Sequence, residues 1–245
     1  MAHTTQPRFR LELVCLQLIC AIFPSLAPCL LLVGQNDDAG GFMIFKPLFD
    51  KETSTYTYLL ADAATRDAVL IDAVQEQTAR DLLLIDQLGL NLLFTLETHV
   101  HADHITGSGA LREATGAQIT VPRGGVQGAD RELGRHDVLR FGRHELVTLE
   151  TPGHTQTCRT YLLDNTMVFT GDALFVRGTG RTDFQGGSAR RLYQSITELF
   201  SLPDDVLVYP GHDYNGNTVS TIAEEKCFNP RLAATGFHAV FRNLR

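Results

Sequence analysis

The amino-acid sequence predicts an α/β fold in which mixed β-sheets carry helices on their outer faces. Short apolar runs recur along most of the chain, and several of them pair across short turns as hairpins. Other runs alternate with helix-like stretches, and the predicted strands outnumber the predicted helices. A four-layer α/β/β/α sandwich is one arrangement that satisfies this pattern.

The first half of the predicted domain alternates strands with helices. Thr78 is of the residue type that caps a helix N-terminus, and Gly89 and Gly116 are of the type that ends a helix. The predicted elements are strands at 56–61 and 68–72, a helix at 78–88, a strand at 92–97, a helix at 105–115 and a strand at 118–121.

The second half begins with two predicted hairpins. They turn at Gly142-Arg143 and at Asp164-Asn165, and Ser188 can cap the helix that comes next. The predicted elements are strands at 138–141, 145–150, 159–163 and 167–170, a helix at 188–200, a strand at 206–209 and a helix at 219–227.

Composition excludes some classes of function. The chain has 245 residues, of which 44% are hydrophobic, so it can bury one sizeable core. A net charge of -7, with no Lys/Arg run interleaved with aromatic residues, argues against a nucleic-acid partner. The five cysteines form no C-x-x-C pair, which argues against a cysteine zinc site and favours a reducing compartment.

The N-terminal segment differs in composition from the rest of the chain. Residues 13–36 carry no charge and follow Arg8 and Arg10, as in a signal peptide or a membrane anchor. Pro24 and Pro28 interrupt the run, and no clean small-residue cleavage site follows it. We interpret residues 1–42 as a non-catalytic leader and residues 43–245 as the catalytic domain. A cytoplasmic location is favoured, and a membrane-anchored or exported protein is the alternative.

A cluster of metal-ligand residue types follows the strand predicted at 92–97. It contains His99, His101, Asp103 and His104. Because side chains alternate along an extended chain, His99 and His101 should project the same way. We expect Asp103 and His104 at the start of the next helix, facing the same cavity. Imidazole and carboxylate groups are ligands for zinc, iron or manganese, and so dense a cluster argues against surface or capping roles alone.

Three later loops repeat one design, in which an apolar strand is followed by a glycine and a ligand residue type. The pairs are Gly153-His154, Gly171-Asp172 and Gly211-His212. Glycine lets the backbone turn sharply and approach a metal closely. Taken with the first cluster, the three loops predict a metal centre built from loops far apart in the sequence.

From about residue 43 to residue 243, these motifs resemble the metallo-β-lactamase superfamily. The resemblance implies the four-layer α/β/β/α sandwich. It also implies a dinuclear pattern in which His99, His101 and His154 hold one metal, Asp103, His104 and His212 hold a second, and Asp172 bridges them.

Within the superfamily, the stretch at residues 178–185 resembles the persulfide (sulfur) dioxygenase family. The same holds for residues 54–58, 101–107 and 229–231. Glyoxalase II is similar around Gly180-Arg181 but does not usually continue with Thr-Asp-Phe. Glyoxalase II also carries a helical C-terminal extension, which we do not expect in a sequence that ends at Arg245. Two departures from the resembled family are Thr179, where a cysteine is common, and the ending at residues 241–245.

The resemblance implies one Fe(II) per chain, held by His99, His154 and Asp172. Two histidines and one carboxylate form a facial triad that leaves coordination positions open for O2 and a substrate sulfur. The implied reaction oxidises glutathione persulfide with O2 to sulfite and glutathione. The alternative is a zinc-dependent glutathione thioester hydrolase of the glyoxalase II kind with two Zn(II) ions. A non-catalytic binding protein that keeps the fold is a third hypothesis, against which the intact ligand set argues.

On this interpretation the other four ligand types, His101, Asp103, His104 and His212, orient the iron ligands, although the sequence leaves a second metal open. We expect Arg181 to bind a glutathione carboxylate or to hold the loop beside the iron, with a structural ion pair to Asp183 as the alternative.

Three further side chains are candidates beside the predicted ligands. Tyr214 can place its hydroxyl over the substrate sulfur, and ordinary packing at the pocket rim is the alternative. Thr155 and Thr170 flank His154 and Asp172 and are candidate supporting hydroxyls. A homodimer is the assembly that we consider for this chain.

Overall fold

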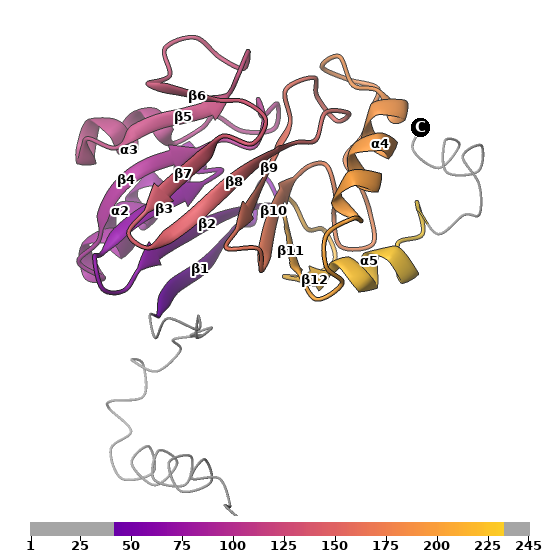
Figure 1. Cartoon of the computed structure of the whole chain (residues 1–245). Helices are drawn as coiled ribbons and strands as arrows, with labels where there is room; N and C mark the ends of the chain where they lie inside the picture. Colours follow the sequence, from indigo (N-terminus) through magenta and orange to yellow (C-terminus); the bar gives the residue numbers. More distant parts are fainter. Residues whose placement is uncertain (1–41, 233–245) are drawn as a thin grey trace, which may run out of the picture. The chain divides into compact units, whose positions relative to one another are not determined.

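The computed structural model describes residues 42–232, in which two six-stranded sheets lie between pairs of helices (Figure 1). The first sheet contains, in spatial order, β1 (Met43–Asp50), β2 (Thr55–Asp62), β3 (Asp67–Ile71), β4 (Asn91–Leu96), β5 (Gln118–Pro122) and β6 (Arg131–Leu133). The second contains β7 (Val138–Phe141), β8 (His144–Glu150), β9 (Arg159–Leu163), β10 (Met167–Gly171), β11 (Leu207–Pro210) and β12 (Ser220–Thr221).

Both sheets are mixed, as the sequence predicts. In the first sheet β1, β2 and β3 pair antiparallel, whereas β3 to β6 pair parallel. In the second sheet only β10 and β11 pair parallel. The helices are α2 (Thr78–Gln87), α3 (Ser108–Thr115), α4 (Ala189–Leu199) and α5 (Ile222–Phe228), with a 3₁₀ turn at Gln75–Gln77.

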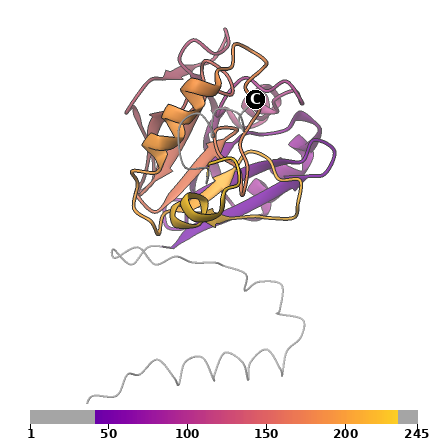
Figure 2. The same cartoon turned by 90° about the vertical axis from the view of Figure 1, so that its right-hand side faces the viewer.

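Three apolar layers hold the four layers of secondary structure together. Alternation along β2 sends Tyr58 and Leu60 into the core between the sheets, where they pack with Phe169 of β10. The intervening Leu59 packs on the outer face with Ile85 of α2. A third core joins the second sheet to α4 and α5, which lie in front of it in Figure 2. The predicted α/β/β/α sandwich is therefore confirmed.

Two predicted helices begin later than expected. Residues 105–107 precede α3, because Thr106 forms a β-bridge with Val74 and the carbonyl of Ile105 accepts the N–H of Gln75. The last helix was expected from residue 219, but Ser220–Thr221 forms β12 and pairs with β11. In both places the first residues of the predicted helix instead pair with a strand or loop that is distant in the sequence, so the helix begins later.

The prediction also missed two strands at the edge of the first sheet. β1 contains Lys46 and Pro47, which weaken a strand pattern but are tolerated at a sheet edge. β6 has only three residues and carries little periodic signal. Both strands are defined by pairing with a neighbour, β1 with β2 and β6 with β5.

The division into a leader and a catalytic domain stays a prediction. Residues 1–41 and 233–245 lie outside the described residues, so the apolar segment at 13–36 and the ending at 241–245 do too. Within residues 42–232, no helix has the length and apolarity needed to span a membrane. Two cysteines lie in this part of the chain, and both Cys158 and Cys227 are free thiols.

Candidate metal centre

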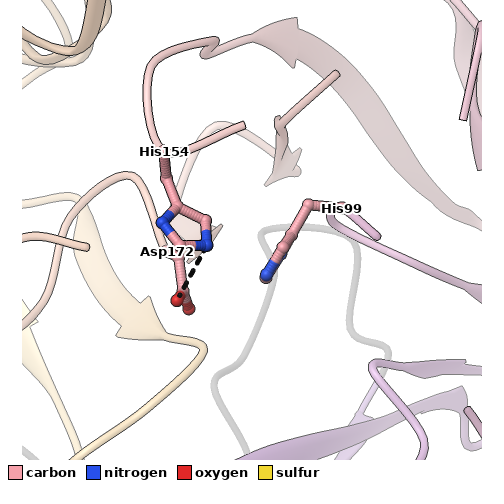
Figure 3. A group of neighbouring side chains, drawn as sticks. All are labelled: His99, His154 and Asp172. Atoms are coloured by element: carbon pink, nitrogen blue, oxygen red, sulfur yellow. Dashed lines mark ion pairs between the residues drawn. The ribbon is translucent and has the colours of Figure 1, made fainter. Parts of the chain in front are cut away.

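Three ligand side chains converge from three separate loops (Figure 3). His99 follows β4, His154 follows β8, and Asp172 follows β10. One ligand atom of each lies within 4.8 Å of the other two, and His154 Nε2 is 3.5 Å from Asp172 Oδ2. The side chains of His154 and Asp172 expose only 12% and 10% of their surface, and His99 is buried. We refer to these three residues as the triad.

In each triad histidine the ring nitrogen that points away from the other ligands, Nδ1, forms a hydrogen bond to the protein. We call it the outer ring nitrogen. Asp72 Oδ2 accepts the hydroxyl proton of Thr98 at 2.8 Å, so Thr98 Oγ1 accepts from His99 Nδ1 at 2.9 Å. His154 Nδ1 donates to the carbonyl of Arg181 at 2.8 Å. Both rings therefore carry their proton on Nδ1 and leave the Nε2 lone pair for a metal.

Electrostatics keeps two members of the triad, His99 and Asp172, in their metal-binding protonation states. Burial, aided by the neighbouring His101, lowers the pKa of His99 to about 3. Burial by itself would raise the pKa of Asp172, but the imidazoles around it, His212 first, hold that pKa below its usual value. A neutral imidazole and an ionised carboxylate are the forms that bind a metal ion.

Two glycines allow the loops to approach Asp172 closely. A Cβ on Gly211 would lie 2.8 Å from Asp172 Oδ1, and one on Gly180 would collide with the Asp172 carbonyl. A Cβ on Gly180 would also lie 3.0 Å from His154 Nδ1. Close backbone approach is therefore the reason for glycine at these positions.

The other ligand types form a second group, which we call the His101 cluster: His101, Asp103 and His104. Their ligand atoms also lie within 4.8 Å of one another. Asp103 Oδ2 accepts from His104 Nδ1 at 2.9 Å. His101 Nε2 lies 3.1 Å from Asp72 Oδ1 and 3.3 Å from Glu97 Oε2. Among the described residues, His101 Nδ1 and His104 Nε2 are buried without a hydrogen-bond partner.

His212 joins the triad to the His101 cluster. Its Nδ1 lies 2.8 Å from Asp172 Oδ1, and its Nε2 lies 3.0 Å from Asp103 Oδ2. Burial opposes a charge on this ring, but the two carboxylates outweigh burial and raise the pKa of His212 to about 10. In this geometry both ring nitrogens of His212 are hydrogen-bonded to carboxylates of the protein.

The sequence prediction for the cluster is partly right. His99 and His101 do project together, with ring centroids 4.1 Å apart. Asp103 and His104 were expected at a helix start, which is wrong, because they lie in the loop between β4 and α3. They also line different cavities, with Asp103 on the larger one and His104 on a smaller one.

Comparison with known proteins agrees with this geometry. The model of the metallo-β-lactamase superfamily matches residues 50–212. The human protein named persulfide dioxygenase ETHE1, mitochondrial, is 50% identical over 203 residues, which are 82% of this chain and 80% of that protein. A crystal structure of ETHE1 from Myxococcus xanthus superposes with a TM-score of 0.80 at 53% identity, covering 82% of this chain and 89% of that one.

The chain belongs to the persulfide dioxygenase family of the metallo-β-lactamase superfamily. A hydroxyacylglutathione hydrolase of Rhizobium meliloti is more distant, at 36% identity over 171 residues, which are 68% of this chain and 65% of that protein. The fold therefore binds metal at a His/Asp site, and the family favours oxygenase chemistry over hydrolysis.

A cleft of about 730 Å³ opens onto the triad of this family member. Arg181 and Tyr214 both line it, together with His154, Asp172 and Arg231. The guanidinium of Arg181 forms a bidentate pair with Asp183, at 2.7 and 3.0 Å, and each side chain is 65% exposed. The ion pair that was the alternative for Arg181 is therefore present, although so exposed a pair adds little stability.

Tyr214 has a different environment from Arg181. Its ring is parallel to that of His212 with centroids 6.0 Å apart, and the residue is 68% exposed. Phe175 lies edge-on to it at 6.4 Å. Tyr214 therefore lies at the rim of the cleft beside two aromatic rings, and most of the residue is exposed to solvent.

The predicted supporting hydroxyls of Thr155 and Thr170 do not contact the triad. Thr155 Oγ1 pairs with Cys158 Sγ at 3.1 Å, and Thr170 Oγ1 donates to the Leu174 carbonyl at 2.6 Å. Each hydroxyl therefore bonds to a nearby residue of its own loop, and Thr170 Oγ1 also contacts the Tyr209 carbonyl at 3.3 Å.

Three supporting residues were missed from the sequence: Asp72, Glu97 and Thr98. Asp72 follows the end of β3 and also accepts the backbone N–H of Thr98 at 2.7 Å. Glu97 accepts from the hydroxyls of Thr106 and Ser108. A polar residue at the end of an apolar strand was a usable signal, since Asp72, like the predicted ligands, follows an apolar strand, although no glycine precedes it.

Proposed function

We propose that this protein is an iron-dependent persulfide dioxygenase that converts glutathione persulfide and O2 to sulfite and glutathione. The observation that carries the proposal is the triad with its outer ring nitrogens already hydrogen-bonded to protein. That donor set, two imidazoles and one carboxylate, is the one that non-haem Fe(II) oxygenases use. The family name of the 50%-identical relatives supports the same chemistry.

The metal ligands in this proposal are His99 Nε2, His154 Nε2 and a carboxylate oxygen of Asp172. When bound, Fe(II) would supply the redox chemistry that dioxygen requires. The residues of the chain hold the ligands still: Thr98 and the Arg181 carbonyl fix the two rings, and His212 fixes the carboxylate. Three protein ligands would leave coordination positions of the metal open for the substrates.

The cleft supplies the binding groups for a peptide persulfide. Its volume falls in the usual range for ligand pockets, roughly 300–1,000 Å³. Arg181 and Arg231 give it two guanidinium groups, and glutathione carries two carboxylates. We infer that Arg181 binds one carboxylate and that the Tyr214 hydroxyl faces the reacting sulfur.

One observation favours the thioester hydrolase with two zinc ions. His101 Nδ1 and His104 Nε2 are buried and lack partners among the described residues, as atoms awaiting a second metal would be. Against it, His212 and Asp103, which a second metal needs, are hydrogen-bonded to each other at 3.0 Å.

The decisive experiment combines elemental analysis of anaerobically purified protein with an oxygen electrode. We expect about one iron per chain. We expect oxygen uptake that depends on glutathione persulfide, sulfite as product and no cleavage of S-lactoylglutathione. Two zinc ions per chain with thioester cleavage would establish the alternative, and iron-loaded protein that consumes no oxygen would end the proposal.

Location and assembly remain predictions of the sequence. We propose a cytoplasmic protein that binds no nucleic acid, with a membrane-anchored or exported protein as the alternative, and a homodimer is the assembly that we consider. The human relative is named as mitochondrial, so fractionation of cells that express the full chain is the direct check. Light scattering of the purified protein tests the dimer.

A further inference from the structure

A second cavity reaches one of the metal ligands, His99, and is lined by residues that do not line the main cleft. It has a volume of about 270 Å³, and its lining shares no residue with that of the 730 Å³ cleft. The main cleft is lined by His154 and Asp172 of the triad, whereas the second cavity is lined by His99. Figure 3 shows that His99 lies across from His154 and Asp172 and points toward them.

The wall of the second cavity is mostly apolar. Apart from Glu97, Thr106 and the histidines, it is formed by Val100, Ile105, Val121, Pro122, Gly125 and Val126. Ile105 and Val126 are 62% and 45% exposed, so they form a rim that faces solvent. No Lys or Arg lines this cavity, in contrast to the main cleft with Arg181 and Arg231.

The two cavities suit ligands of different size and polarity. The main cleft has the volume and the cations for a charged peptide, and such a ligand would cover His154 and Asp172. The second cavity is smaller than a typical organic-ligand pocket of roughly 300–1,000 Å³. Small apolar molecules transfer favourably from water into apolar cavities of this kind.

We propose that the second cavity is the route and holding site through which dioxygen reaches the metal beside His99. The inference rests on the proposed dioxygenase function. It assigns the two substrates to separate openings, so that a bound persulfide does not block oxygen. Val126 and Ile105 set the width of the opening on the oxygen side.

The first test uses xenon, an apolar atom that occupies such cavities, in pressurised crystals of the iron-loaded protein. We expect xenon density between Val121, Val126 and His99 in the wild type. We expect no density there in V126W or I105W, because an indole at the rim fills the opening. Wild-type crystals without xenon in this cavity would overturn the inference, whatever the activity of the enzyme.

The second test separates the two substrates kinetically in the same holoenzymes. We expect V126W to raise the KM for O2 by about fivefold and to leave the KM for glutathione persulfide unchanged. L83W is the matched control, since Leu83 is also exposed, at 57%, but lies on α2 away from both cavities. An unchanged KM for O2 in both rim variants overturns the inference.

The two tests also distinguish this inference from the proposed function. Wild-type holoprotein that consumes no oxygen overturns the dioxygenase proposal and the oxygen route with it, even if xenon binds. Normal oxygen uptake without xenon binding overturns the route alone.

Discussion

The triad and the His101 cluster contain the same residue types, but their hydrogen bonds differ. In the triad, protein groups bind the Nδ1 atoms of His99 and His154 and leave both Nε2 atoms for a metal. In the His101 cluster, Asp103 is shared between His104 and His212. Ligand residue types in a tight group are therefore not equivalent: in the His101 cluster the carboxylate of Asp103 is already hydrogen-bonded, whereas His101 Nδ1 and His104 Nε2 have no hydrogen-bond partner among the described residues.

The triad and the His101 cluster also differ in how hydrogen bonds orient their side chains. The triad histidines rely on groups that are distant in sequence, with Asp72 lying 26 residues before Thr98 and Arg181 lying 27 residues after His154. The His101 cluster also bonds to distant residues, because Asp103 bonds to His212 as well as to His104, and His101 Nε2 lies 3.1 Å from Asp72 Oδ1. The triad histidines differ in that a hydrogen bond on Nδ1 orients each ring and leaves its Nε2 for a metal.

The largest expected effect comes from removing a triad ligand. His154→Ala should reduce bound iron to below about a tenth of a molar equivalent and lower oxygen uptake on the order of 10³-fold. Elemental analysis and an oxygen electrode measure both. His136→Asn, at an exposed histidine outside the site, is the control. Iron content above half in H154A would contradict the assignment of this residue.

The next effect tests the support behind the triad. Thr98→Val removes the hydroxyl that joins Asp72 to His99 while keeping the side-chain shape. Because the His99 ring loses its anchor, we expect iron to bind about 10–100-fold more weakly in competition with a chelator. Thr98→Ser keeps the hydroxyl and should bind iron like the wild type. Equal affinities for T98V and the wild type would show that the hydrogen bond does not support the ligand.

A smaller effect is expected in the cleft that opens on the triad. Arg181→Ala should raise the KM for glutathione persulfide by about tenfold and leave the iron content unchanged, because the backbone carbonyl that anchors His154 is still present. Steady-state kinetics on the iron-loaded protein measures this.

The matched control for that variant is Asp183→Asn. It breaks the ion pair but keeps the guanidinium, so the KM should stay near that of the wild type. If both variants raise the KM equally, the pair is structural and Arg181 does not bind the substrate.

The smallest effect should come from the His101 cluster. His104→Ala removes a side chain that the triad does not use, so we expect about one iron per chain and a kcat within roughly fivefold of the wild type. Elemental analysis gives the iron content. Loss of iron in this variant would mean that the cluster holds a metal, and the contrast between the two groups would then fail.

Most of the strands and ligand loops could be predicted because short sequence patterns mark them. Apolar runs with period two gave the strands from β2 to β5 and from β7 to β11, and a glycine after a strand marked the loops of His154, Asp172 and His212. The elements that were missed or shifted, β1, β6, β12 and the start of α3, are defined by pairing with distant strands or loops.

The sequence by itself determined the fold class, the family resemblance and the set of residues able to bind a metal. Only the tertiary structure brought His99, His154 and Asp172 together from three loops, and only it showed which cavity each ligand type lines. The reason is physical: both nitrogens of an imidazole can bind, and a hydrogen bond from a distant part of the chain selects between them. Thr98 with Asp72 makes that selection for His99, and the Arg181 carbonyl makes it for His154.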